Sequence, residues 1–190
     1  MARWEGGARE RLLAAALKRF GEQGFEGTTV AEIAATAGLT ERTFFRYFAD
    51  KREVLFHGHE EFQRAFIDPI EAAPDTGDPM SIVANALGSA AATRFLDGRR
   101  EWSRARQAVI AADPGLQERE LLKMSALAAA MAGALQARGF NATAATLAAE
   151  SGVAVFRVAF ANWIAEGEQR AYPECLDEAF AELRALLASA

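Results

Sequence analysis

Apolar residues recur at three- and four-residue spacing along most of the chain, a pattern that predicts amphipathic helices. In the first of them, over residues 7–23, Leu13, Leu17 and Phe20 share one face. No stretch alternates apolar and polar residues as a half-buried strand would. We therefore expect an all-α protein of about nine helices, over residues 7–23, 30–37, 40–48, 51–67, 80–96, 99–112, 116–138, 143–167 and 174–188.

Two of the expected helices are short and meet at Gly38. Thr29 and Glu32 have the spacing of a capping box, which predicts the beginning of the first of the two. Gly38 suits the end of that helix, and Thr40 is placed to cap the second, over residues 40–48. Two short helices joined by so short a turn predict a helix-turn-helix motif.

The second short helix has two unlike halves. A wheel at about 100° per residue separates an aromatic half, Glu41, Phe44, Phe45 and Phe48, from a polar half, Arg42, Thr43, Arg46 and Tyr47. We expect the aromatic half to pack into a core with the preceding helices. The polar half offers two guanidinium groups and no carboxylate, which suits the base edges of a DNA major groove. The alternative is a helical hairpin whose arginine and threonine face is merely solvated.

Composition supports the helical interpretation and narrows the setting. Ala supplies 44 residues, whereas Val, Ile and Thr together supply 22. No apolar run reaches the roughly 18–20 residues that span a bilayer, and the first residues lack the apolar core of a signal peptide. The single cysteine, Cys175, excludes an internal disulfide and fits the cytoplasm. We expect no metal site, because His57 and His59 lie two apart on a helix and diverge.

Charge is distributed unevenly along the chain, whose net charge is −5. Residues 1–52 carry nine Lys or Arg and seven Asp or Glu, whereas residues 53–190 carry twelve and nineteen. Only the first quarter of the chain is therefore suited to a polyanion such as DNA.

The segment around the helix-turn-helix reads TTVAEIAATAGLTERTFFRYFADKREVLF, over residues 28–56. Its Ile-Ala-x-x-Ala-Gly-Leu core, its Thr-Phe-x-x-x-Phe and the following Lys resemble the DNA-binding signature of the TetR family of bacterial transcriptional regulators. This resemblance implies a three-helix DNA-binding domain over residues 1–52, connected by the helix at 51–67. It also implies a larger helical effector-binding and dimerisation domain over residues 53–190.

The resemblance also implies roles for individual residues of the N-terminal segment. The expected phosphate contacts are Thr29, Thr40, Tyr47 and Lys51, and the expected base contacts are Arg42, Thr43 and Arg46. The family usually has Tyr where this chain has Phe45, and that Tyr often touches the DNA backbone. Because Phe45 cannot donate a hydrogen bond, we expect Tyr47 to supply the missing hydroxyl.

The last two helices carry apolar stripes, which the family resemblance assigns to a four-helix dimer interface. The expected interface residues are Phe156, Phe160, Trp163, Phe180, Leu183 and Leu187. The alternative is that both stripes face the core of their own protomer.

Large or flexible side chains of the middle helices are candidates for an effector pocket. They are Phe95, Trp102, Arg106, Met124, Leu127 and Met131. Four nearby arginines form either an anion-binding rim or a solvated face. They are Arg99, Arg100, Arg104 and Arg106. The region also resembles a subgroup of these regulators that is linked with acyl-CoA-like or other acidic ligands.

We therefore expect a cytoplasmic homodimer that binds a palindromic double-stranded DNA operator, most simply as a repressor. A mainly apolar effector, with or without an acidic group, would release it from DNA. We expect no cofactor, no metal and no membrane partner. The alternatives are a DNA-binding dimer without an effector and a helical enzyme, although no acid–base or metal-binding constellation is found in the sequence to support the enzyme.

Overall fold

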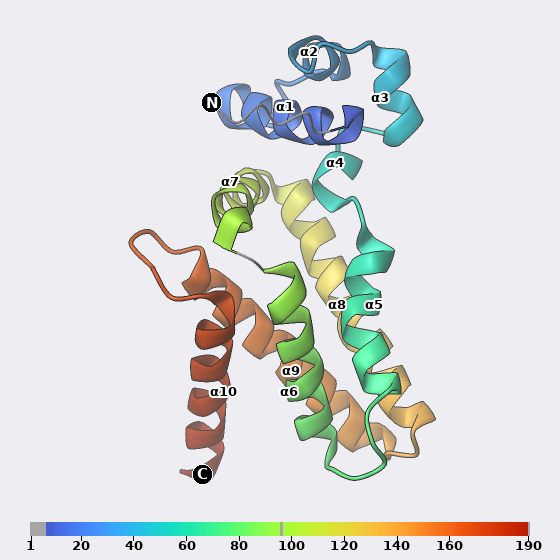
Figure 1. Cartoon of the computed structure of the whole chain (residues 1–190), viewed down its shortest axis with the longest axis vertical. Helices are drawn as coiled ribbons and strands as arrows, with labels where there is room; N and C mark the ends of the chain where they lie inside the picture. The colour runs from blue at the N-terminus through green and yellow to red at the C-terminus, as the bar shows by residue number, and fades with distance from the viewer. Residues whose placement is uncertain (1–6, 96, 190) are drawn as a thin grey trace. The chain divides into compact units, whose positions relative to one another are not determined.

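The computed structural model describes residues 7–95 and 97–189 (Figure 1). Within these ranges the chain forms helices and no strand, which confirms the all-α prediction. The short 3₁₀ helix η1 covers Asp97–Arg99. The α-helices are α1 (Ala8–Gln23), α2 (Val30–Thr36), α3 (Glu41–Tyr47), α4 (Glu53–Phe56), α5 (His59–Glu71), α6 (Pro79–Arg94), α7 (Arg100–Ala111), α8 (Pro114–Ala137), α9 (Ala142–Trp163) and α10 (Tyr172–Ala188).

The helix predicted over residues 51–67 is wrong as a single element. The structure has α4 and α5 in its place, separated at His57 and Gly58. Gly58 has a φ of 76°, in the left-handed region that favours glycine and ends a helix. Helix α5 also continues past residue 67 and includes Pro69, which lies between two of the predicted helices. This split is why the described residues contain ten α-helices where nine were expected.

Contacts divide the chain into two compact units. The first consists of Met1–His59 with Ala105–Glu120, and the second of Glu60–Arg104 with Leu121–Ala190. Helix α4, most of α7 and the beginning of α8 thus belong with the N-terminal helices. The domains expected over residues 1–52 and 53–190 stay a prediction, and the first six residues of the former lie outside the described part of the chain.

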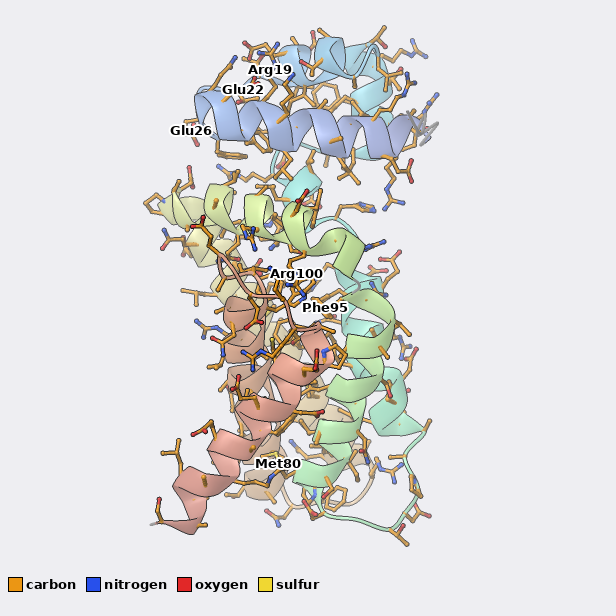
Figure 2. The ribbon with its side chains drawn as sticks, turned by 60° about the vertical axis from the view of Figure 1, so that its left-hand side comes forward. Arg19, Glu22, Glu26, Met80, Phe95 and Arg100 are labelled. Atoms are coloured by element: carbon orange, nitrogen blue, oxygen red, sulfur yellow. The ribbon has the colours of Figure 1, made fainter. Side chains whose placement is uncertain are left out.

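The first unit is built around the packing of α1, α2 and α3. Its buried apolar side chains come from these helices, from α4 and from the adjoining parts of α7 and α8: Leu12, Ala15, Ala16, Phe20, Phe25, Ile33, Ala37, Phe44, Phe48, Val54, Leu55, Phe56, Val109, Ile110 and Leu116. Arg19, labelled on α1 in Figure 2, adds a polar link. Its Nε donates to Thr36 Oγ1 on α2 at 2.8 Å. The helix-turn-helix therefore rests on a core of its own.

The exposure of Phe45 differs from the sequence-based prediction. The aromatic half of α3 was expected to be buried as a whole, but 54% of Phe45 is exposed, whereas Phe44 and Phe48 are buried. Phe44 and Phe48 are four residues apart and lie almost one above the other, so they form a narrow stripe. Phe45 is turned by about 100° from Phe44 and falls outside that stripe.

Helix α9 is central to the second unit, where it packs against α6 and α10. Gly152 of α9 is buried, and a Cβ atom at this position would lie 2.3 Å from Val83 Cγ1 on α6. By length and composition, α9 also meets the criterion for a membrane-crossing helix, with a mean hydropathy of 1.4. Since 44% of that window is buried inside the structure, the apolar composition of α9 also serves the core of its unit.

Candidate nucleic-acid interface and effector unit

The N-terminus of α2 has the predicted capping box. Glu32 N donates to Thr29 Oγ1 at 3.2 Å, while Thr29 N and Thr29 Oγ1 each donate to Glu32 Oε2 at 2.8 Å. The backbone hydrogen bond from Thr29 is the main reason why the pKa of the Glu32 carboxyl lies below its ordinary value. Thr29 is exposed, as a phosphate contact requires, but its hydroxyl proton is already donated to Glu32.

The turn between α2 and α3 fixes how the two helices meet. Gly38 has a φ of +66°, and its N–H donates to Ala35 O at 3.0 Å. Leu39 N donates to Ala34 O at 2.9 Å, which completes a Schellman motif. The chain then enters α3 directly, because Thr40 Oγ1 accepts from Thr43 N at 3.2 Å. The predicted helix-turn-helix is therefore present, and each of its helices has a side-chain cap.

The exposed side of α3 carries the candidate DNA-binding side chains. Arg42, Arg46 and Tyr47 are exposed, and Thr43 is half-buried with its hydroxyl 3.1 Å from Thr40 Oγ1. Arg46 is engaged locally, since its Nη2 donates to Tyr47 Oη at 3.2 Å and its Cζ lies 4.9 Å from the centre of that ring. For Arg42 the structure shows no such partner among the described residues, so its donors are available to a ligand.

Lys51 has an unexpected position. Its Nζ donates to three backbone carbonyls of the loop between α1 and α2, those of Phe25 at 2.8 Å, Thr28 at 3.1 Å and Glu26 at 3.4 Å. An ammonium group has three hydrogens, so these bonds use all of them. No local sequence pattern indicates this role of Lys51, because the contact joins residues 26 apart.

Arg106, a predicted pocket residue, lies in the first unit and holds α4. Its Nε donates to Leu55 O at 2.7 Å, and its Nη2 pairs with Glu120 at 2.8 Å. Arg119 pairs with Glu53, the first residue of α4. Both guanidinium groups lie over the ring of Phe56, at 5.3 and 4.9 Å. Arg106 is buried and bonded to Leu55 and Glu120, so the structure gives it a packing role in this unit.

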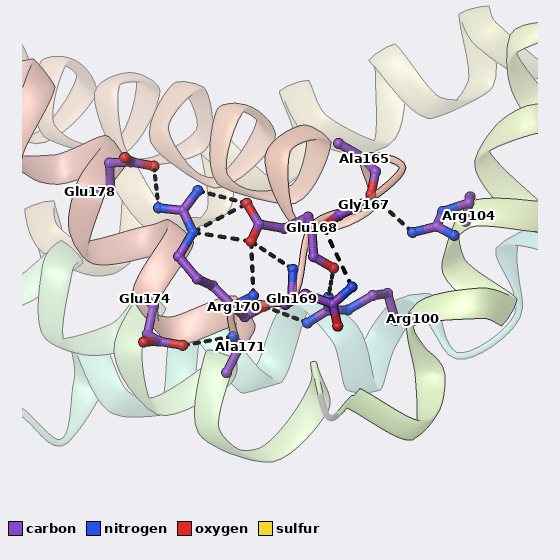
Figure 3. A network of polar contacts seen from close by, with 10 residues as sticks. All are labelled: Arg100, Arg104, Ala165, Gly167, Glu168, Gln169, Arg170, Ala171, Glu174 and Glu178. Carbon is purple, nitrogen blue, oxygen red and sulfur yellow. Dashed lines mark hydrogen bonds and ion pairs between the residues drawn. The ribbon is translucent and has the colours of Figure 1, made fainter.

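Two of the four clustered arginines fasten the loop between α9 and α10 (Figure 3). Arg104 Nε donates to Ile164 O at 2.7 Å and its Nη2 to Ala165 O at 3.0 Å, which caps the C-terminus of α9. Arg100 donates to the carbonyls of Glu168 and Arg170. These two side chains therefore form neither the expected anion-binding rim nor a merely solvated face.

A charged pair within the same loop reinforces it. Arg170 Nη2 lies 2.6 Å from Glu168 Oε2, and Arg170 Nη1 lies 3.1 Å from Glu178 of α10 (Figure 3). The side-chain hydrogen bond from Arg170, helped by the Arg170 backbone N–H, lowers the pKa of Glu168 to about 2. The α9–α10 connection is thus an ordered polar structure at neutral pH.

The remaining predicted pocket residues lie in the second unit and do not surround a described cavity. Met124, Leu127 and Met131 are buried in its core, Phe95 is partly buried, and 39% of Trp102 is exposed. The two cavities described have volumes of about 220 Å³ and 360 Å³. The first is lined by Phe20, Gln23, Gly24, Phe25, Glu26, Gly27, Val109, Ala112 and Asp113, and the second by Ala142, Thr143, Thr146 and Leu147.

An aromatic cluster occupies the core of the second unit. Its members are Phe62, Phe66, Phe95, Phe156, Phe160, Trp163 and Tyr172. Trp163 is fully buried, and its Nε1 has no hydrogen-bond partner among the described residues. Burial also raises the pKa of the Tyr172 hydroxyl far above its ordinary value. An unpaired buried N–H costs free energy, so Trp163 Nε1 is a buried donor in this core that lacks an acceptor.

The predicted dimer residues divide into two groups. Phe156, Trp163 and Phe180 are buried within the protomer, which favours the alternative that their stripe faces its own core. Phe160 and Leu183 are partly buried, and 68% of Leu187 is exposed. The opposite side of α9 exposes apolar side chains that the sequence analysis did not assign to the interface, among them Leu147 at 64% and Val158 at 53%.

Comparison with known proteins agrees with this architecture. A sequence profile described as "Bacterial regulatory proteins, tetR family" matches residues 12–57, and one described as "MftR C-terminal domain" matches residues 77–188. The transcriptional regulator TcmR of Streptomyces glaucescens is 37% identical over 93 residues, 49% of this chain and 41% of TcmR. AcrR of Shigella flexneri is 34% identical over 82 residues, 42% of this chain and 38% of AcrR. The matches thus span about two fifths of these relatives.

Solved structures share the fold over nearly the whole chain. The complex of SmeT with triclosan has a TM-score of 0.64 at 22% identity, covering 93% of this chain and 91% of SmeT. A transcriptional regulator from Aquifex aeolicus has a TM-score of 0.56 at 18% identity, covering 95% and 99%. The likeness at these identities concerns the fold alone. The two profile matches go further, because together they include most of the residues, and the chain belongs to the TetR family of helix-turn-helix transcriptional regulators.

Proposed function

We propose that this regulator binds a palindromic DNA operator as a homodimer and that a small-molecule effector releases it. The observation that carries the proposal is the exposed face of α3, where Arg42 and Arg46 project from a helix held by its own core. Arginine forks recognise guanine edges in the major groove, and a helix of this size enters that groove. Arg42, Thr43 and Arg46 would contact bases.

Phosphate contacts would come from the ends of the two short helices and from Tyr47. Thr29 and Thr40 are exposed at the N-termini of α2 and α3, where backbone N–H groups favour an anion. Tyr47 is 37% exposed and retains its hydroxyl proton when it accepts from Arg46. Lys51 would reach a phosphate only by releasing one of its three carbonyl partners.

Dimerisation is supported by the apolar side of α9 that faces away from the protomer core. Leu147, Ala154, Val158 and Ala161 are exposed and recur at spacings that keep them on one helical face. The last turn of α10 adds Leu186 and Leu187. Two copies would bury this face, and the dimer would supply two α3 helices for two half-sites whose major grooves lie about 34–36 Å apart.

Effector control is supported by the core of the second unit. The buried, unpaired Trp163 Nε1 among aromatic rings suits a mainly apolar molecule that presents a hydrogen-bond acceptor. SmeT, which shares the fold, is seen in complex with triclosan. Arg100 and Arg104 are bound to carbonyls, so these two side chains give no support to an acidic group on the effector. Repression in the cytoplasm is the simplest outcome of such binding.

A second candidate is a DNA-binding dimer without an effector. It is favoured by the dense packing of Met124, Leu127 and Met131, and by the two described cavities, neither of which these residues line. A thermal-shift screen with apolar compounds separates the two candidates. A compound present at 100 times its dissociation constant stabilises the protein by about 2.7 kcal/mol. An effector must also weaken DNA binding, because a ligand with equal affinity for both states shifts nothing.

Selection of duplexes from a random pool by the full chain tests DNA binding. We expect an enriched palindrome whose half-sites lie about one helical turn, 10–10.5 base pairs, apart. Sedimentation of the complex should show two chains per duplex. A pool that remains random after several rounds, although the chain is folded, would contradict the proposal.

A further inference from the structure

Nothing within the fold explains why the apolar side chain of Phe45 is exposed on α3. The large apolar side chains described as exposed in the first unit are Phe45, at 54%, and Tyr47, at 37%, and both belong to α3. Tyr47 has a hydroxyl that accepts from Arg46, whereas Phe45 has no polar atom in its side chain. An exposed phenyl ring gains most from a partner that removes it from water.

The position of Phe45 indicates what that partner is. On α3 it follows Arg42 by three residues and precedes Arg46 by one, about 60° and 100° away around the helix. Both guanidinium groups lie to one side of it, and the exposed Glu41, four residues earlier, lies about 40° to the other side, so Phe45 stands at the edge of the arginine face. Its ring packs edge-on against Phe44, with the centroids 5.5 Å apart and the planes at 83°, so the buried neighbour supports one ring orientation.

Among the groups that base edges display to such arginines in the major groove, one is apolar. The major groove displays hydrogen-bonding atoms and, at thymine alone, a methyl group that apolar side chains such as Phe contact. A phosphate is excluded as the partner, because it needs a donor and Phe45 has none.

We propose that Phe45 reads the 5-methyl group of a thymine and so determines part of the operator specificity. This inference rests on the DNA binding proposed above. A hydrogen-bonding side chain would not supply this role. The sequence preference given by Phe45 would depend on the methyl group of thymine and not on a hydrogen-bonding atom of the base pair.

Deoxyuridine tests the inference, because it pairs like thymidine but lacks the methyl group. Each thymidine of the selected duplex is replaced in turn, and the dissociation constant is measured for the wild type, Phe45→Ala and the control Tyr47→Phe. At one thymine per half-site the wild type should bind about four-fold more weakly, the fold-change that corresponds to burying one methyl group. Phe45→Ala should bind both duplexes equally, and Tyr47→Phe should keep the wild-type ratio.

The result is decisive in either direction. A wild-type ratio near one at every position, or the same ratio for Phe45→Ala, overturns the inference. Phe45→Leu, which keeps an apolar side chain, should keep part of the ratio and provides a second variant. Lower salt strengthens every complex enough to be measured. Failure of DNA binding itself would be recognised earlier, because the wild type would then enrich no duplex at all.

Discussion

The ammonium nitrogen of Lys51 lies 2.8 Å from the carbonyl oxygen of Phe25 and 4.4 Å from the centre of its ring. This contact joins the segment after α3 to the loop before α2, across 26 residues of sequence. The carbonyls of Glu26 and Thr28 in the same loop also accept from Lys51. One side chain therefore ties the segment that follows the helix-turn-helix to the loop that precedes it. The family resemblance had suggested a phosphate contact for this lysine.

Lys51→Ala separates a structural role of Lys51, in which it binds the loop carbonyls, from a phosphate contact. We expect it to lower the free energy of unfolding by roughly 1–3 kcal/mol, the contribution of hydrogen bonds made by a charged group. Lys18→Ala is a matched control, because Lys18 is exposed and pairs with Glu22 only at 3.9 Å. Chemical denaturation followed by circular dichroism measures both. The phosphate role would instead be supported if the variant is as stable as the wild type and its slope of log binding constant against log salt concentration falls by about one per contact.

Arg104→Met should destabilise the second unit, because it removes the donors to Ile164 O, at the C-cap of α9, and to Ala165 O, which follows it. The expected loss is roughly 1–3 kcal/mol, measured by thermal or chemical unfolding. Arg99→Met is the control, since Arg99 is exposed in the same segment, and a surface change of this kind stays within about 0.5 kcal/mol. Equal effects of the two substitutions would show that the cluster acts through its overall charge and not through the α9 cap.

Gly152→Ala should destabilise the protein by about 1–3 kcal/mol, because its Cβ would overlap with Val83 on α6. Gly133→Ala is the contrasting control: nothing lies within 4 Å of its Cβ position, and alanine favours a helix by up to about 1 kcal/mol. In a Val83→Ala background Gly152→Ala should lower the free energy of unfolding by less, because the effects of substitutions at contacting residues are not additive. Undiminished cost in that background would disprove the steric explanation.

Val158→Glu should give a folded monomer. Val158 is 53% exposed in the protomer, so a charge there leaves the fold intact but costs about 3–5 kcal/mol if the residue is buried without a partner between two copies. Sedimentation at several concentrations measures the shift. Ala92→Glu, an exposed position on α6, provides the control and should leave the dimer unchanged. If Val158→Glu remains as dimeric as the wild type, another face forms the dimer.

The parts of the fold that the sequence predicted depend on local chemistry. The Thr29–Glu32 capping box and the Gly38 turn each involve residues within a few positions of one another, and both are present. Gly58 shows a limit of this approach, because the helical pattern predicted over residues 51–67 runs through this glycine, although its backbone ends α4.

The parts that the sequence could not predict depend on contacts between distant segments. Arginine patterns look alike whether the side chain meets solvent, a ligand or a backbone carbonyl, and only the fold brings Arg104 to the end of α9, 60 residues away. The apolar stripe of α9 presented the same difficulty. Both sides of this helix are apolar, and the periodicity alone did not distinguish the side holding Trp163 from the side holding Val158.

The most direct test of DNA reading by α3 compares Arg42→Ala with the wild type on two duplexes, the selected operator and a scrambled sequence of equal length. Arg42 is exposed and available, so the account predicts a loss of about 1–3 kcal/mol per half-site on the operator and little change on the scrambled duplex. An equal loss on both duplexes would contradict the account, because Arg42 would then hold the backbone and another surface would read the bases.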